Sequence, residues 1–174
     1  MKTDKNTEQV LSELEKHGFE AYMVGGCVRD TIMGRQYNDI DITTNARPDE
    51  MLEVFKDYKV IPTGIKHGTV TVLCGGTPYE ITTYRIDGKY TDHRRPDSVE
   101  FTSDITDDLA RRDFTINAVA MDRNGSVIDP FDGIADMKAG IIRCVGEPEK
   151  RFSDEPGSAQ HRRRHDQRLF QHDL

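Results

Sequence analysis

The sequence of 174 residues contains no apolar run that approaches the ~20 residues needed to cross a membrane. Its first five residues lead into polar sequence and lack the apolar centre of a signal peptide. The three cysteines, Cys27, Cys74 and Cys144, are odd in number and far apart, which argues against a disulfide framework and gives no zinc-binding spacing. These absences predict a soluble, cytoplasmic protein with reduced thiols and no membrane partner.

Basic residues are also scarce, with 24 Lys and Arg against 31 Asp and Glu and a net charge of −7. Residues 1–155 carry −9, and the last nineteen residues carry +2. A domain with this balance does not hold a nucleic-acid backbone through its overall charge. We therefore expect local acidic clusters that hold Mg²⁺, and individual arginines that contact phosphates. The length fits one domain with its own hydrophobic core.

Strand and helix patterns interleave along the chain, and Gly75 and Gly76 predict a hairpin turn between two strands. Because a hairpin makes its two strands antiparallel, the sheet is not purely parallel. The predicted fold class is α/β (α+β), with a mixed sheet flanked by helices. The predicted helices are 7–17, 28–33, 48–55, 104–112 and 134–138, and the predicted strands are 21–24, 38–43, 59–61, 69–73, 79–83, 127–128 and 141–145, while 115–121 is either a strand or a buried helical segment.

Two short motifs carry the most chemical information. Gly25 and Gly26 precede a predicted helix, and glycines there let backbone N–H groups approach a polyphosphate. Asp39 and Asp41 follow on a predicted strand, where alternate side chains share one face about 6.6 Å apart. Two carboxylates so placed can share divalent metals, which suits an in-line displacement at phosphorus. Together the motifs predict a metal-dependent nucleotide site.

Six short motifs follow one another in the chain: VGGCVRD at 24–30, NDIDITTNA at 38–46, KHGTV at 66–70, YEITTYR at 79–85, RRDFTINA at 111–118 and DPFDG at 129–133. In this order they resemble the catalytic head of the bacterial-type (class II) tRNA nucleotidyltransferases, the CCA-adding enzymes. Bacterial poly(A) polymerases share the same head. The resemblance implies a nucleotidyltransferase head of the DNA polymerase beta type. It implies that CMP and AMP are added from CTP and ATP to the 3′ end of tRNA, with pyrophosphate released.

The resemblance also implies roles for individual residues. Asp39 and Asp41 would be the catalytic residues and would hold two Mg²⁺ ions. Arg111, Asp113 and Asn117 would face the incoming nucleotide and its sugar.

Several candidate residues are open to two interpretations. Arg29 either pairs with Asp30 at the surface or, as we favour, contacts the triphosphate, because an arginine fork suits phosphate oxygens. Arg111, Arg112 and Asp113 fit a basic helix C-terminus, but the resemblance favours nucleotide contacts, most clearly for Asp113.

Two further polar residues stand in strand-like or apolar sequence. Glu80 either supplies a third carboxylate near the metals or faces solvent. Asn117 lies in an apolar stretch and needs a hydrogen-bond partner, which is either the ribose or triphosphate or a backbone group.

The end of the chain departs from the resemblance. Residues 1–153 are predicted to form the catalytic head, and residues 154–174 an atypical, disordered tail. The family follows residues 151–152 with a helix whose Asp and Arg read the base of CTP and ATP, but Pro156 and Gly157 oppose that helix here. We therefore expect nucleotide binding with little base discrimination, and weak or no extension of tRNA by this chain alone.

Three alternatives stay open. Residues 84–96 resemble the flexible loop of full CCA-adding enzymes, yet a poly(A) polymerase or an A-adding relative remains an alternative parent. Residues 39–43 also fit the Asp-x-Asp-x-Thr motif of haloacid dehalogenase-type phosphohydrolases, but that motif ends an apolar central strand, whereas the polar residues 34–38 precede it here. The third alternative is a non-catalytic nucleotide- or RNA-binding module.

Overall fold

The computed structural model describes residues 4–37, 39–86 and 100–147. Most of the loop at 84–96 and the whole tail at 154–174 lie outside the described residues. The helices are α1 (Lys5–Lys16), α2 (Gly26–Ile32), α3 (Pro48–Val54), α4 (Ile105–Ala110) and α5 (Gly133–Ala139), with two 3-10 turns, η1 (Ile65–His67) and η2 (Thr115–Asn117). The strands are β1 (Ala21–Val24), β2 (Asp41–Thr44), β3 (Lys59–Gly64), β4 (Thr69–Cys74), β5 (Thr77–Thr83), β6 (Arg85–Ile86), β7 (Glu100–Phe101), β8 (Ala120–Met121) and β9 (Val127–Ile128).

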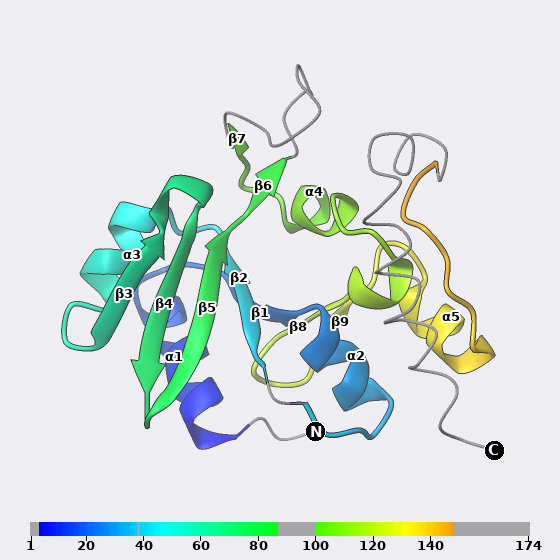
Figure 1. Cartoon of the computed structure of the whole chain (residues 1–174), viewed down its shortest axis with the longest axis horizontal. Helices are drawn as coiled ribbons and strands as arrows, with labels where there is room; N and C mark the ends of the chain where they lie inside the picture. The colour runs from blue at the N-terminus through cyan, green and yellow to red at the C-terminus, as the bar shows by residue number, and fades with distance from the viewer. Residues whose placement is uncertain (1–3, 38, 87–99, 148–174) are drawn as a thin grey trace.

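Seven of these strands form one sheet in the order β3-β4-β5-β2-β1-β8-β9, and β6 pairs with β7 beside it (Figure 1). Among the described strands, β2 and β5 form the one parallel pair, and every other pair is antiparallel. The mixed sheet predicted from the Gly75–Gly76 turn is confirmed, with Cys74 paired to Thr77 across that turn. Both glycines have positive φ, at 59° and 85°, as a two-residue hairpin turn requires.

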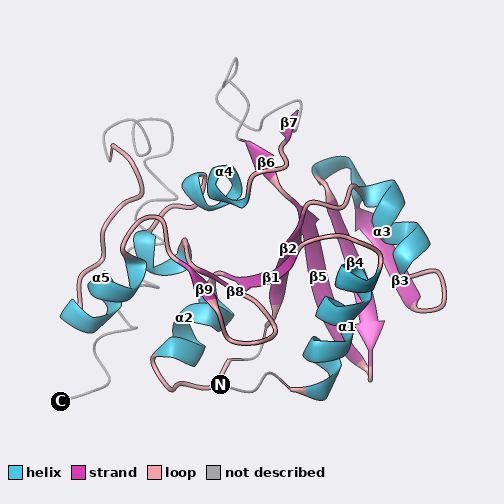
Figure 2. Cartoon of the chain, turned by 180° about the vertical axis from the view of Figure 1, so that it is seen from behind, coloured by secondary structure: helices cyan, strands magenta, loops and turns pink. Residues whose placement is uncertain are grey.

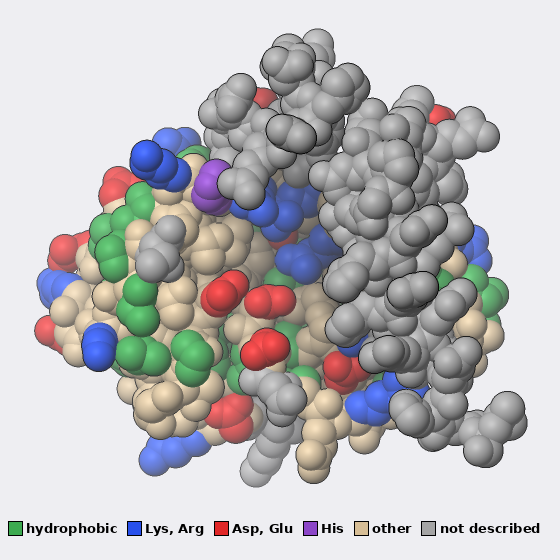
Figure 3. Space-filling view, viewed as in Figure 1, with side chains coloured by type: hydrophobic (Ala, Val, Ile, Leu, Met, Phe, Trp, Pro, Cys, Tyr) green, Lys and Arg blue, Asp and Glu red, His purple; other side chains and the backbone are tan. Residues whose placement is uncertain are grey.

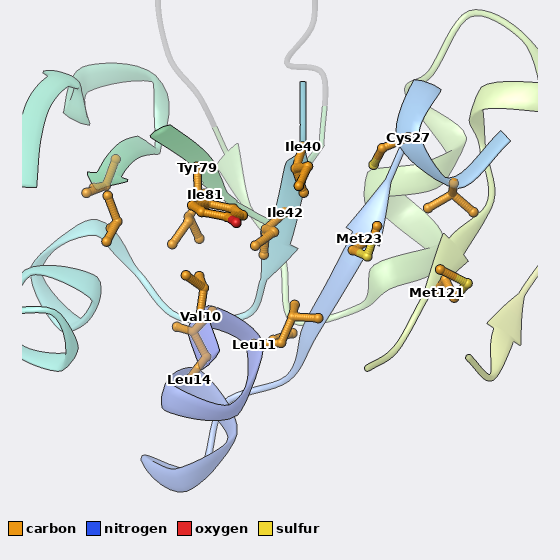
Figure 4. Close-up of a cluster of buried hydrophobic side chains, with 14 of the residues drawn as sticks. Val10, Leu11, Leu14, Met23, Cys27, Ile40, Ile42, Tyr79, Ile81 and Met121 are labelled. Carbon is orange, nitrogen blue, oxygen red and sulfur yellow. The ribbon is translucent and has the colours of Figure 1, made fainter. Parts of the chain in front are cut away.

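The larger of two hydrophobic clusters among the described residues, the core, lies on one side of this sheet, and a smaller cluster that includes Val24 and Ala120 is separate from it. Helices α1 and α3 cover that side, as the view from behind shows (Figure 2). The apolar stripe of α1, with Val10, Leu11 and Leu14 fully buried, faces Ile42 of β2 and Ile81 of β5 (Figure 4). Because side chains alternate along a strand, the residues next to these isoleucines point to the opposite side. The core therefore fixes which strand residues face the site.

Two predicted strands have different bounds in the structure. The strand expected at 38–43 begins only at Asp41, so Asp39 precedes it rather than alternating with Asp41 along a strand. The strand expected at 141–145 is not formed, and Cys144 makes only an isolated bridge with Phe114. The residues on either side of Cys144 make hydrogen bonds to the irregular segment around Phe114 instead. The Thr115 N–H donates to Arg143 O, and the Val145 N–H donates to Asp113 O. Short apolar runs do not distinguish these outcomes.

Helix α5 packs directly on η2, the turn that carries Asn117, and Gly133 permits this contact. A Cβ atom at Gly133 would lie 2.2 Å from the Thr115 carbonyl oxygen and 2.7 Å from Val119 Cγ2. We expect Gly133→Ala to lower the free energy of unfolding by about 2–3 kcal/mol in urea denaturation, because backbone must move to make room. Ala135→Ser, on the exposed side of α5, serves as the control and should change it by less than about 0.5 kcal/mol. Equal stability of the two variants would contradict this packing argument.

Candidate nucleotide site

The acidic side of the site is built by the strand pairing. Asp41 opens β2, where it pairs with Val24 of β1 on one side and with Glu80 of β5 on the other. In-register neighbours on adjacent strands point to the same face of a sheet, so the Asp41 and Glu80 carboxylates share the face opposite the core. Both side chains are exposed, as is Asp39 just before the strand. Figure 3 shows acidic side chains gathered over β5 and β2, beside a hollow bordered by basic side chains below α4.

The protein perturbs the ionisation of the Asp41 carboxylate. Desolvation by the surrounding atoms raises its pKa, the Arg112 guanidinium opposes that rise, and the charge of Asp39 adds to it. The contribution of Asp39 agrees with the prediction that these two carboxylates lie near one another. A divalent cation would relieve this repulsion.

Gly25 brings the acidic and basic sides together. It follows β1 with φ 74° and ψ −139°, a backbone conformation that glycine adopts readily and other residues do not. A Cβ atom there would lie 3.1 Å from Arg112 Nη1 and 3.5 Å from Asp41 Oδ2. The structure therefore places three of the predicted site residues, Gly25, Asp41 and Arg112, in direct proximity. The motifs that carry them are far apart in the chain.

Arg29 forms a second cluster with Asp30 and Asn117. The guanidinium is buried and donates two hydrogen bonds to the Asp30 carboxylate, at 3.0 and 3.2 Å. Its Nη1 donates to Asn117 Oδ1 at 2.7 Å, across 88 residues of sequence. The pair with Asp30 is thus present, but it is buried and also holds the amide of Asn117. Gly26 lies against the same side chain, since a Cβ there would be 3.5 Å from Arg29 Nη2.

Arg111 and Arg112 come directly after α4, and both are anchored by a residue that the sequence analysis missed. Asp108 is completely buried, accepts a hydrogen bond from Arg111 Nε at 2.9 Å and pairs with Arg112 Nη2 at 3.5 Å. The sequence did contain a signal for these pairs, because Arg111 and Arg112 follow Asp108 by three and four residues, the spacings at which helical side chains meet. Arg112 is incompletely satisfied, because its Nε has no hydrogen-bond partner among the described residues. Desolvation lowers the Arg112 pKa, and Asp108 opposes that shift.

The donor set suits a hard cation. No group of three His, Cys, Asp or Glu side chains within the described ranges converges as a ready metal site. Mg²⁺, however, uses one or two carboxylates and completes its shell with water and substrate phosphates. Asp39 and Asp41 offer oxygen ligands of this kind, with Glu80 beside Asp41 in the sheet register. The residues therefore fit Mg²⁺ held jointly by the protein and a nucleotide.

Cys27 lies next to this site but is not a nucleophile. Its side chain is 3% exposed, its thiol donates to Val24 O at 3.1 Å, and burial raises its pKa to about 11. We expect iodoacetamide at neutral pH to label the partly exposed Cys144 well before Cys27, because only the thiolate reacts. Peptide mass spectrometry over time measures both rates, and labelling in denaturant provides the control, where the two rates should converge. Equal rates in the folded protein would contradict the burial of Cys27.

None of the helices within residues 4–37, 39–86 and 100–147 has the length and apolar character of a membrane span.

Comparison with known proteins gives concordant matches. Residues 21–143 match the family described as the poly A polymerase head domain. The CCA-adding enzyme of Lactobacillus helveticus is 57% identical over 146 residues, which cover 84% of this chain and 36% of the relative. That of Leuconostoc mesenteroides is 53% identical over 150 residues, which cover 86% and 37% of the two chains.

Solved structures give the same result. The crystal structure of the Bacillus stearothermophilus CCA-adding enzyme in complex with CTP has a TM-score of 0.78 and 44% sequence identity to this chain. The match covers 87% of this chain and 36% of that enzyme. The chain thus spans little more than a third of the length of the relatives that it matches.

Proposed function

This chain belongs to the poly A polymerase head-domain family, and on that premise we propose that it is the catalytic head of a CCA-adding tRNA nucleotidyltransferase. In the proposed reaction, the 3′-hydroxyl of tRNA attacks the α-phosphorus of CTP or ATP and pyrophosphate leaves. The observation that carries the proposal is the position of Asp41, between Glu80 on one side and Gly25 and Arg112 on the other. This arrangement, with two carboxylates and a guanidinium near one another on the face of the sheet opposite the core, supports the proposal.

Each polar residue of the site has a part in this proposal. Asp39 and Asp41 would hold Mg²⁺, which lowers the pKa of the attacking hydroxyl and neutralises charge on the leaving pyrophosphate when bound. Arg112, next to Asp41, and Arg111 would offset the charge of the triphosphate. The absence of a side chain at Gly25 keeps the space between Asp41 and Arg112 open.

The sugar side of the nucleotide is assigned to Asp113 and Asn117. Arg29 fixes the Asn117 amide by donating to its oxygen, which leaves the amide N–H groups to donate to a hydroxyl or phosphate oxygen. Arg29 therefore orients Asn117 in this proposal, besides any contact of its own with the triphosphate. The Asp113 carbonyl is held by the Val145 N–H at 3.0 Å, which fixes the backbone that carries the carboxylate.

The proposed partners are CTP, ATP and the tRNA 3′ end, in the cytoplasm, where thiols such as the three here stay reduced. We propose a head domain that ends near residue 153, a boundary outside the described residues. For this chain alone we propose Mg²⁺-dependent binding of CTP and ATP with little base discrimination. Extension of tRNA is weak or absent, since the helix that reads the base is opposed by Pro156 and Gly157.

Two measurements on the 174-residue chain test this proposal. Equilibrium dialysis with labelled CTP and ATP, with Mg²⁺ or with EDTA, should show binding of both nucleotides only with the metal. Incubation of tRNA lacking its CCA end with the labelled nucleotides should show little extension. Failure to bind either nucleotide with Mg²⁺ would overturn the proposed site, and efficient ordered CCA addition would overturn the proposed lack of base selection.

The poly(A) or A-adding alternative predicts repeated AMP transfer from ATP alone to an RNA primer, and the same extension assay distinguishes it. The phosphohydrolase alternative is disfavoured by the strand geometry. Its motif requires aspartates at the end of a central parallel strand, but Asp41 opens β2, and β1 beside it is antiparallel. An aspartyl-phosphate trapped on Asp39 would reverse this conclusion.

A further inference from the structure

The Asp108 carboxylate joins three separate segments behind the nucleotide site. Its Oδ1 accepts from Arg111 Nε at 2.9 Å and from the Arg85 N–H at the start of β6, at 3.3 Å. Its Oδ2 lies 3.5 Å from Arg112 Nη2 and 3.2 Å from Thr43 Oγ1 of β2, whose one hydroxyl proton it shares with the Thr82 carbonyl oxygen, also at 3.2 Å. Four groups thus converge on one carboxylate that has no exposed surface.

This burial makes the carboxylate difficult to replace. The Arg111 and Arg112 side chains are themselves only 16% and 18% exposed, so water does little to compensate their charges. Removing one partner of a buried ion pair leaves the other charge uncompensated, which costs more than the pair contributes. Asparagine at position 108 keeps the size of the side chain and removes only the negative charge. The two arginines would then lose the charge that directs them.

Asp108 also contacts β2, the strand that begins with Asp41. Thr43 lies two residues after Asp41 on β2, and its side chain is on the same face. Arg112, held from behind by Asp108, points toward Gly25, where an added Cβ atom would lie 3.1 Å from Arg112 Nη1 and 3.5 Å from Asp41 Oδ2. Asp108 therefore links the Arg112 guanidinium to the strand that carries Asp41.

We propose that Asp108 is a positioning residue that holds Arg111 and Arg112 against β2, in the geometry in which they meet the triphosphate of the nucleotide. The proposal rests on the proposed function, because that function supplies the triphosphate. It assigns no contact between Asp108 and the substrate. It differs from a purely structural role because it requires Asp108 to act through Arg111 and Arg112.

The chain offers a matched control in the neighbouring Asp107. This residue lies in the same turn of α4 and accepts a hydrogen bond from Thr102 Oγ1 at 2.8 Å, and Thr102 is not one of the groups that converge on Asp108. We expect Asp108→Asn to weaken Mg²⁺-dependent CTP binding by about tenfold or more, the usual effect of losing a hydrogen bond to a charged group. Asp107→Asn should change it less than about twofold. Equal effects of the two variants would overturn the proposal.

A mutant cycle tests whether Asp108 acts through the two arginines. If it does, adding Asp108→Asn to a variant that carries Arg111→Met and Arg112→Met should weaken CTP binding no further. Fully additive losses would assign Asp108 to general stability and overturn the proposal. Should Asp108→Asn fail to fold, Thr43→Val takes its place, since it removes one donor to the carboxylate without changing charge. Unchanged CTP affinity in folded Thr43→Val would then count against the proposal.

The Nε–Hε NMR signals of Arg111 and Arg112 separate failure of the anchor from failure of the proposed function. In the absence of nucleotide, the Arg111 signal should be protected from exchange in the parent and in Asp107→Asn, and lost in Asp108→Asn. A protected signal that persists in Asp108→Asn overturns the anchor whatever the nucleotide results. If the Arg111 signal is lost in Asp108→Asn while the parent binds no CTP, the result supports the role of Asp108 in holding Arg111. It then contradicts only the proposed function.

Discussion

Replacing Asp41 by asparagine is expected to abolish Mg²⁺-dependent CTP binding and, at the same time, to stabilise the metal-free protein at neutral pH. The asparagine side chain keeps the shape of the aspartate but is a poor ligand for Mg²⁺. Since loss of an outer partner of a metal ligand already costs ten- to a hundredfold, we expect at least about a hundredfold weaker binding. Nucleotidyl transfer by an active assembly that contains this head should fall by about a thousandfold or more.

The expected gain in stability follows from the raised pKa of Asp41. A carboxyl whose pKa is higher in the folded than in the unfolded state favours folding below its unfolded pKa, near 3.8. That contribution is lost as the pH rises through the folded pKa, because neighbouring atoms desolvate one side of the exposed Asp41 carboxylate and Asp39 repels it, although Arg112 offsets part of this effect. Asparagine has no charge to desolvate. The stability difference between Asp41→Asn and the parent should therefore be small in acid and should grow toward neutral pH.

Thermal melting from acid to neutral pH, with EDTA or with Mg²⁺ and CTP, measures both effects in one series. Asp57→Asn, an exposed change of the same charge after α3, is the control and should alter neither stability nor CTP binding appreciably. A lower melting temperature for metal-free Asp41→Asn at neutral pH would contradict the assigned desolvation. Normal Mg²⁺-dependent CTP binding by Asp41→Asn would show that Asp41 is not a metal ligand.

Replacing Gly25 by alanine is expected to have the second-largest effect. The backbone conformation at φ 74° and ψ −139° strains any side chain, at about 2 kcal/mol of stability. The added methyl group would also lie 3.1 Å from Arg112 Nη1 and 3.5 Å from Asp41 Oδ2. We expect CTP binding to weaken by about tenfold or more, because the guanidinium and the carboxylate are pushed out of their common site.

Gly34→Ala separates backbone strain from the effect on the site. Gly34 also has a positive φ, at 70°, but nothing lies within 4 Å of its added Cβ. Urea denaturation and CTP dialysis on both variants should show a loss of stability in each, and a loss of CTP affinity only in Gly25→Ala. If both variants bind CTP like the parent, Gly25 has no part in the site.

Sequence alone could predict the hairpin in the sheet and the start of α4, because turn and cap residues act on their immediate neighbours. Gly75 and Gly76 specify a hairpin, and Asp104 caps α4 by accepting from the Thr106 N–H, as expected of an aspartate before a helix. The strand expected at 38–43 was wrong in its start, since alternation of aspartate and isoleucine does not show where pairing begins. Pairing depends on Val24 and Glu80, which belong to other segments.

The site could be predicted only in part, for a similar reason. The two short motifs selected Gly25 and Asp41, the family resemblance selected Arg112, and the structure brings the three residues together. The metal ligands and the nucleotide contacts remain predictions. Asp108 was missed because an aspartate in the first turn of a helix usually faces solvent. Its burial becomes evident only from the tertiary contact with Thr43.

The parallel pairing of β2 with β5 bears on the order in which the chain folds. Hairpin β4–β5 closes through two residues, whereas Asp41 meets Glu80 only after the segment that contains α3, β3 and β4 has folded back. Closing that long loop costs entropy before any contact compensates it. By this loop-closure argument we expect a refolding molecule to form its β4–β5 hairpin before it pairs Asp41 with Glu80, so that nucleotide binding appears only after the hairpin.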